Sequence, residues 1–412
     1  MVSQGRSSSV RSAVVSRRAI MCRCVCSSAR LGGIGHATPL VALARALAAA
    51  GAEVRMACPS PAADRLKAIG LPVTRIGLSA EAAHELCLDR YPEIRSMPGR
   101  QLPGYVFPRL FGDITASAQF PDLFDIARSW QPSVLVHDAG DLAAPVVAAA
   151  IGVPNVCHGF GTVIPAATVI AAAERTDRLW AAVGLPPRPY GGCFDHLYVD
   201  PFPPSLQPKR SEHLGRVIAE APQAAAAGPS ESIPVAVADA LAAGMPLVHV
   251  TFGTVYNTTA TFEAAVAAVS RLDAVVLVTV GPGGETSAFG KYGSHVHVER
   301  FVAQSLVMPR TTALVSHAGS GTVLAALQHG VPQLCLPQAA DQFRNADAVA
   351  HSGAGISIMD APLADVIEAA VRRLLDDPQL RAEARTIAAE IAAMPSADEV
   401  AQEIVAVAAL SH

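Results

Sequence analysis

The stretch best suited to chemistry is 313–330, where an apolar run ends in His317 and a Gly-Ser-Gly-Thr turn leads into a helix pattern. A helix that begins at such a turn directs unpaired backbone N–H groups and the positive end of its dipole at one spot. This arrangement suits a phosphate group. We therefore expect a phosphate site, with His317 beside it, at Gly319, Ser320, Gly321 and Thr322.

A second strand pattern, 331–337, is followed by a turn that carries Asp341 beside Gln342. Consecutive strand-to-helix turns of this kind place their polar residues at the carboxyl edge of one parallel sheet. Ligands of open α/β sheets bind at that edge. One ligand could therefore contact both turns.

A glycine-rich turn at 32–36 follows the first predicted strand, 23–27, and ends in His36. The turn lacks the third glycine of the dinucleotide-binding fingerprint, and no acid ends the second strand, so a nicotinamide cofactor is not expected. At a helix start that faces the predicted cleft, a neutral His36 could accept a proton. Taken alone, a single His at a turn is more often a capping or packing residue.

Asp138 favours the functional interpretation of His36, because it ends a later strand of the same predicted sheet. A carboxylate bonded to one imidazole nitrogen fixes the tautomer and stabilises the imidazolium formed after proton abstraction. Asp141, one helical turn later, is an alternative partner. An Asp at the end of a strand is also a common helix N-cap.

The chain contains no Asp-x-Asp sequence, so we do not expect a metal that bridges a nucleotide diphosphate to paired carboxylates. We expect no cofactor. Backbone N–H groups, the helix dipole and His317 would then meet the diphosphate charge. Thr254, after the predicted strand 247–251, offers a hydroxyl beside Gly253, where a ligand can approach the backbone closely. A turn with Gly and Thr is also structurally routine.

Composition indicates a globular protein with large cores, since 412 residues are 51% hydrophobic and carry a net charge of -4. No apolar run reaches the roughly 18 residues of a membrane span. The acidic balance and few aromatics argue against nucleic acid as a partner.

Eight scattered cysteines are expected to be reduced core residues of a cytoplasmic protein. Cys22, Cys24 and Cys26 would share a strand face, where a small apolar lining is favoured over a metal site.

The alternation of strand and helix patterns predicts an α/β protein with two doubly wound parallel sheets. An irregular stretch at 77–120 is expected to be loops and short helices that border a cleft, and another at 158–207 is expected to be a second set of loops. We expect the chain to divide into a disordered extension (1–20), a first Rossmann-like domain (21–220), a linker (221–236), a second Rossmann-like domain (237–395) and a C-terminal helix (396–412).

Taken together, these pieces resemble the family 1 glycosyltransferases, and more narrowly the bacterial antibiotic and natural-product members. The resemblance spans nearly all of 21–410 and is most specific at 301–345. It rests on Gly33-Ile34-Gly35-His36-x-x-Pro39-Leu40, Phe252-Gly253-Thr254, His317 to Thr322, Gly330-Val-Pro-Gln through Asp341-Gln342, and Pro203 to Gln207.

The resemblance implies a GT-B fold, with two Rossmann-like domains facing each other across a cleft. The N-terminal half would bind the acceptor, the C-terminal half would bind a nucleotide sugar, and the last helix would cross back to the first domain. His36 would be the catalytic base and Asp138 its partner. Donor-binding residues would include Gly35, Thr254 and His317 with Gly319 to Thr322 at the phosphates, and Asp341 and Gln342 at the sugar hydroxyls.

Two positions depart from the pattern of the family. Where relatives usually stack Trp on the nucleobase this chain has Phe301, which keeps a π face of smaller area, and backbone groups of Val302 would read the base edge. Relatives that use UDP-sugars commonly have an acid for the ribose hydroxyls where this chain has Ala325. That absence favours a deoxyribose donor, TDP-sugar over UDP-sugar.

The sequence thus predicts a metal-independent, inverting transfer of a (deoxy)sugar from a nucleoside-diphosphate donor to a hydroxyl of a hydrophobic natural-product aglycone. Alternatives are a nucleotide-sugar hydrolase or epimerase on the same fold, or a non-catalytic auxiliary protein. The expected partners are the nucleotide sugar and a hydrophobic small-molecule acceptor. We expect no nucleic acid and no membrane insertion, and a homodimer is possible.

Overall fold

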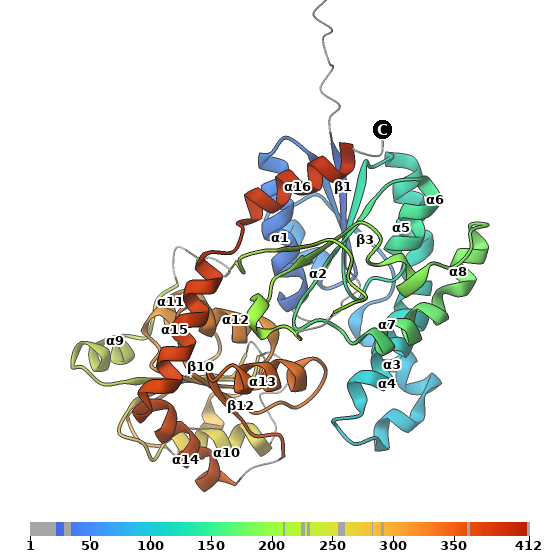
Figure 1. Ribbon diagram of the computed structural model, residues 1–412. Coiled ribbons are helices and arrows are strands. Elements are labelled where there is room, and N and C mark those ends of the chain that lie inside the picture. The colour runs from blue at the N-terminus through green and yellow to red at the C-terminus, as the bar shows by residue number, and fades with distance from the viewer. Residues whose placement is uncertain are drawn as a thin grey trace, which may run out of the picture.

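A computed structural model describes residues 22–28, 34–208, 211–223, 227–228, 231–253, 260–281, 283–289, 292–360 and 363–409, with only the backbone of 34–39 and 288. The extension expected at 1–20 lies outside these residues. The described chain forms two parallel sheets, each with helices on both sides (Figure 1).

The first sheet contains seven described strands in the order β3-β2-β1-β4-β5-β6-β7, and all neighbouring strands are parallel. The central strands β1 and β4 are buried almost throughout, as expected for a sheet covered on both faces. The strands are β1 Arg23–Ser27, β2 Glu53–Cys58, β3 Val73–Arg75, β4 Val134–Asp138, β5 Asn155–His158, β6 Leu197–Asp200 and β7 Val217–Ala219.

The second sheet has six described strands in the order β10-β9-β8-β11-β12-β13, again all parallel. Strand order therefore reverses between β1 and β4 in the first sheet and between β8 and β11 in the second. These reversals are the switch points at which open α/β sheets bind ligands. The strands are β8 Leu247–Thr251, β9 Val275–Thr279, β10 Val296–Glu299, β11 Ala313–Ser316, β12 Gln333–Cys335 and β13 Gly355–Ser357.

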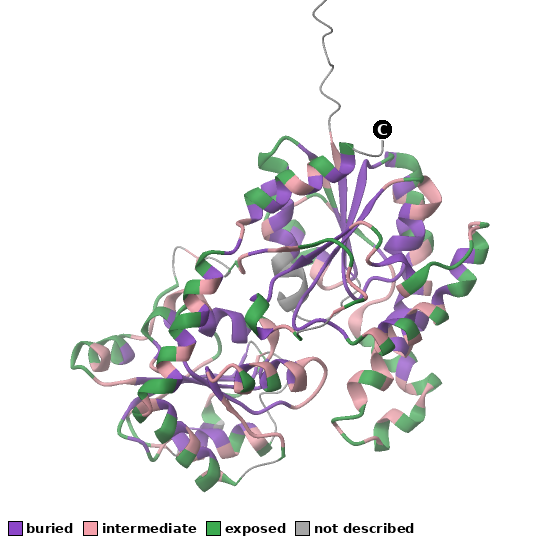
Figure 2. Ribbon diagram, viewed as in Figure 1, coloured by how far each residue is buried: buried purple, intermediate pink, exposed green. Residues whose placement is uncertain are grey.

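Helices cover the sheets, and Figure 2 shows the strands as the buried centre of each half, with exposed residues on the outer helix faces. The first half contains α1 Ile34–Ala49, α2 Ala62–Ala68, α3 Ala80–Arg90, α4 Leu102–Phe107, α5 Ala116–Trp130, α6 Ala144–Ile151, α7 Ala166–Ala173 and α8 Asp177–Ala182. The second contains α9 Val235–Ala242, α10 Ala260–Val269, α11 Gln304–Val307, α12 Ser320–Gln328, α13 Gln342–His351, α14 Ala364–Asp376 and α15 Pro378–Ala392.

The last helix, α16 Ala397–Ala409, follows α15 closely in the chain but lies beside α1 on the first sheet (Figure 1). Its buried side chains, among them Val400 and Ile404, join the same core cluster as Leu40 and Leu43 of α1. The C-terminus thus completes the core of the N-terminal half.

The predicted architecture of two parallel α/β sheets is confirmed, and several local predictions are wrong. Helix α1 begins at Ile34, so part of the stretch expected to be a glycine-rich turn is already helical. Short helices, as expected, occur at 77–120 (α3, α4 and the start of α5), whereas 158–207, expected to be loops, contains β6 as well as α7 and α8. Within the described residues, the helices are all too short or too polar to cross a membrane.

Candidate active site

The turn between β11 and α12 is built around the ring of His317, which is almost fully buried. A Cβ atom added to Gly319 would lie 2.7 Å from Nε2 of His317, and one added to Gly253, after β8, would lie 3.1 Å from Cε1. Ala318, between His317 and Gly319, has a left-handed φ of 62°, which is costly for a residue with a side chain. The imidazole is therefore held between the backbones of two turns at the switch point of the second sheet.

Helix α12 starts immediately after this turn, with Gly319 as its N-cap. The N–H of Thr322 donates to the carbonyl of Gly319 at 3.0 Å, and the Thr322 hydroxyl accepts from Nε2 of Gln304 at 3.0 Å. Because the first N–H groups of a helix have no partner inside it, the amides of Ser320 and Gly321 can bind an anion.

The turn after β12 meets the start of α12 directly. The Ser320 hydroxyl donates to Oδ2 of Asp341, so the two turns singled out in the sequence are in contact. Oε1 of Gln342 accepts from the backbone N–H groups of Gln338 and Ala339 at 2.8 and 2.9 Å, which holds that turn closed. Among the described residues, Nε2 of Gln342 has no hydrogen-bond partner and can donate to a ligand.

Asp138 lies at the switch point of the first sheet, at the carboxyl end of β4 beside β1, as His317 does at the carboxyl end of β11 beside β8 in the second sheet. Its side chain is buried, and its two oxygens accept hydrogen bonds from the hydroxyl of Ser28 and, at 2.7 Å, from the N–H of Gly140. The backbone of His36 and Gly35 lies in the first turn of α1, which leaves the end of β1. Their side chains, and all of Thr254, lie outside the described residues.

Asp141, the alternative partner, has a different role. One of its oxygens accepts from the N–H groups of Ala143 and Ala144, both at 3.1 Å, at the start of α6. Burial raises the pKa of this carboxyl above its usual range, although those hydrogen bonds oppose the shift. Asp141 therefore stabilises the start of a helix, while Asp138 lies at the strand end.

The residues expected at the nucleobase lie in the loop between β10 and α11. Phe301 is 58% exposed, so its ring face is open for stacking, whereas Val302 is buried. Ala325, at the position where an acid would bind ribose, is buried on α12 and packs with Met308 and Leu314. An acidic side chain would not fit this apolar cluster without rearrangement.

Comparison with known proteins identifies the family of this chain. Residues 263–407 match the family described as erythromycin biosynthesis protein CIII-like, C-terminal domain. Over 406 residues the chain is 32% identical to L-demethylnoviosyl transferase of Streptomyces niveus, covering 91% of this chain and 96% of the relative. The chain belongs to the family 1 glycosyltransferases of antibiotic and natural-product biosynthesis. It is also 29% identical over 394 residues to elloramycin glycosyltransferase ElmGT of Streptomyces olivaceus, covering 90% and 94%.

Solved structures agree with the fold of this glycosyltransferase. The glycosyltransferase VinC in complex with dTDP superposes with a TM-score of 0.75 at 24% identity, covering 94% of this chain and all (100%) of the other. Spinosyn rhamnosyltransferase SpnG complexed with thymidine diphosphate gives 0.74 at 24% identity, covering 93% and 100%. The GT-B fold expected from the sequence is therefore confirmed.

Sequence reasoning missed two polar residues that touch the candidate site of the glycosyltransferase. Ser28 holds the carboxylate of Asp138, and Asn345 contacts both Ser320 and Asp341. Asn345 stands four residues after Asp341, a spacing that places both side chains on one face of α13. That helical spacing was the available signal, since no composition or motif marks either residue.

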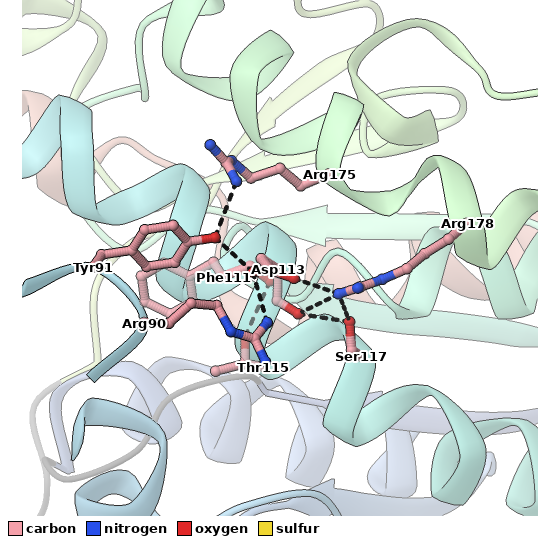
Figure 3. A network of polar contacts seen from close by, with 8 residues as sticks. All are labelled: Arg90, Tyr91, Phe111, Asp113, Thr115, Ser117, Arg175 and Arg178. Atoms are coloured by element: carbon pink, nitrogen blue, oxygen red, sulfur yellow. Dashed lines mark hydrogen bonds and ion pairs between the residues drawn. The ribbon is translucent and has the colours of Figure 1, made fainter. Parts of the chain in front are cut away.

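A polar network joins segments of the first half of the glycosyltransferase (Figure 3). Asp113, in a π-helical segment at Pro108–Thr115, accepts from Arg90 at 2.9 Å, from the hydroxyl of Tyr91 at 2.7 Å and from Arg178. Arg175 in turn donates to the Tyr91 hydroxyl at 3.2 Å. Burial opposes ionisation of Asp113, yet these donors hold the pKa of its carboxyl below the usual value. The two stretches expected to border the acceptor cleft are thereby fixed to each other.

Proposed function

We propose that this glycosyltransferase transfers a deoxysugar from a TDP-sugar to a hydroxyl of a hydrophobic aglycone, with inversion at the anomeric carbon and without a metal. The observation that carries the proposal is the hydrogen bond between Ser320 and Asp341. It joins a helix start suited to a diphosphate with a carboxylate suited to sugar hydroxyls, at the switch point of one sheet.

In the donor half, His317 and the first amides of α12 would bind the diphosphate. Phe301 would stack on the base, with backbone groups of Val302 at its edge, and Asp341 and Gln342 would bind the sugar. Thymidine diphosphate is favoured over UDP because Ala325 offers the ribose no acceptor. The two structural neighbours in complex with thymidine diphosphate support the same choice.

In the acceptor half, we assign the base to His36, with Asp138 as its partner. The acceptor hydroxyl would give its proton to the imidazole and form a bond to the anomeric carbon, while the bond to the diphosphate oxygen breaks on the opposite face. A positioned base of this kind contributes about 10²- to 10⁴-fold to rate. Donors already aimed at the diphosphate would stabilise the charge that develops on the leaving group.

The test is to incubate the purified protein with TDP-sugars and UDP-sugars, with and without a panel of aromatic and macrocyclic aglycones. We expect TDP release that depends on the aglycone, a glycosylated product with inverted anomeric configuration by NMR, and unchanged rates after EDTA treatment. TDP release without an aglycone would instead indicate a hydrolase. Nucleotide binding without any turnover would indicate an auxiliary protein, and loss of activity on chelation would refute the metal-independent mechanism.

A further inference from the structure

One fully buried side chain, Asn345 on α13, contacts both turns of the candidate donor site and also the opposite half of the molecule. Its Nδ2 donates toward the carbonyl of Ala318 at 3.1 Å, the hydroxyl of Ser320 at 3.0 Å and Oδ2 of Asp341 at 3.0 Å. A carboxamide has two N–H bonds for these three acceptors, so it orients them as one group.

The oxygen of the same carboxamide faces the first half of the chain. Oδ1 of Asn345 accepts from the backbone N–H of Thr162 at 3.2 Å and from the Thr162 hydroxyl at 3.3 Å. Next to it, Gly161 lies so close that an added Cβ would be 2.6 Å from Oγ of Ser320 and 3.1 Å from Oδ2 of Asp341. The loop after β5 therefore packs directly on the donor-site residues.

That loop is itself fixed within the first half. The N–H of Gly159 donates to the carbonyl of Val199 on β6 at 2.8 Å, and the N–H of Val163 donates to Oε1 of Gln207 at 2.9 Å. Gln207 is held in turn by both oxygens of Asp200. Because the loop is anchored on both sides of Thr162, Thr162 moves together with the acceptor half.

We propose that Asn345 is a positioning residue that couples the acceptor half to the grip on the donor sugar. Thr162 holds the Asn345 amide in one orientation, and that orientation sets the Asp341 carboxylate and the Ser320 hydroxyl for the sugar and its phosphate. The inference rests on the proposed function, since it requires Asp341 to bind the donor. It predicts that changes at Thr162, a residue of the other half, alter donor affinity through Asn345.

The test compares binding of TDP-glucose and of TDP by calorimetry in wild type, Asn345→Ala, Thr162→Val and the double variant. Loss of a hydrogen bond to a charged group should weaken TDP-glucose binding about tenfold in Asn345→Ala, and the single hydroxyl lost in Thr162→Val should cost about threefold. In the Asn345→Ala background, Thr162→Val should have no further effect, because the coupling partner is gone. The affinity for TDP alone should fall less than that for TDP-glucose in each variant.

Gly161→Ala provides a second route, because its methyl group would push the loop away from Ser320 and Asp341 without removing any polar group. We expect weaker TDP-glucose binding in this variant, whereas Gly215→Ala, whose Cβ would make only an ordinary 3.4 Å contact near the start of β7, should bind like wild type. Gly161→Ala also keeps the inference testable if Asn345→Ala does not fold.

The outcomes separate the two proposals. If wild type binds neither TDP nor TDP-glucose, the proposed donor is wrong, and the proposed role of Asn345 in donor binding is refuted as well. If wild type prefers TDP-glucose and the variants keep that preference, or if the effects of Thr162→Val and Asn345→Ala simply add, then only the role of Asn345 is refuted. Equal losses for TDP and TDP-glucose, with a lowered melting temperature, would mean a purely structural residue.

Discussion

Replacing Asp138 by Asn tests the proposed base and its partner with little change in shape. In the native site, Oδ1 of Asp138 accepts from Gly140 and Oδ2 accepts from the Ser28 hydroxyl. An asparagine can keep both contacts, since its oxygen can face the Gly140 amide and its NH₂ group can donate to the Ser28 hydroxyl. The fold should therefore lose no more than about 1 kcal/mol of unfolding free energy.

Catalysis should respond very differently to Asp138→Asn. A neutral amide cannot stabilise an imidazolium, and its donor side favours the wrong tautomer of the histidine. We expect kcat to fall about 10²- to 10⁴-fold, equivalent to roughly 3 to 5 kcal/mol of barrier. The assay is aglycone-dependent TDP release, with the melting temperature and TDP affinity measured in parallel, and both of these should stay close to wild type.

Asp141→Asn is the matched control, because the same substitution is made three residues away in a carboxylate that binds the N–H groups at the start of α6. Its oxygen can keep those bonds, so turnover should stay within about threefold of wild type, under 1 kcal/mol of barrier. If Asp138→Asn retained similar turnover, the partner assignment would be refuted. A reversed result, with Asp141→Asn inactive, would make Asp141 the partner.

Three further predictions concern the donor half and the core. Gly319→Ala should lower TDP affinity about tenfold or more, because its Cβ would displace His317, whereas Gly321→Ala, with open space around its Cβ, should leave the melting temperature of the nucleotide-free protein unchanged. Phe301→Ala should weaken TDP binding by about 1 to 3 kcal/mol, measured by calorimetry, and Phe301→Trp should restore it. Burial opposes charge on His158, but Glu220 raises its pKa. The stability from this pair should therefore be full below about pH 6.5, the usual pKa of histidine, and should be lost as the pH rises from there through the raised pKa; Glu220→Gln should flatten that dependence in urea melts.

The strands that carry the candidate site could be predicted from the sequence because each is a short, nearly continuous apolar run followed by a turn. The edge of the first sheet was missed for a physical reason. Strand β6 has only four residues between loops rich in Gly and Pro, and β7 has three residues at an exposed edge. Runs that short carry too little periodicity to be distinguished from loops.

The extent of the helices at 80–130 was obscured by proline. Pro103 opens α4, Pro108 opens the π-helical segment, and Pro121 lies inside α5. Each lacks the N–H that a helix interior uses, so a sequence pattern alone argues for breaks. The chain accommodates Pro103 and Pro108 at helix starts, the second of them in a wider π-helical turn, and keeps Pro121 inside α5. The Asp113 network then fixes the segment from outside.

Only those residues of the candidate site that belong to sequence motifs could be predicted. His317, Gly319 and Asp341 stand in a recognisable order, and the sheet then brings Ser320 and Asp341 together. Asn345 could not be found in this way, because its partner Thr162 is 183 residues away and belongs to the other half. Contacts of that range depend on how two sheets meet, which no local pattern encodes.

The return of α16 to the first sheet has a consequence for biosynthesis. Val400, Ile404 and their neighbours fill a core otherwise made of residues translated first. During synthesis on the ribosome, the N-terminal half keeps an uncovered apolar surface until the residues of α16 have emerged. Release of nascent chains that end before residue 397 should therefore yield an N-terminal half that binds chaperones or aggregates, whereas a chain that includes α16 buries that surface.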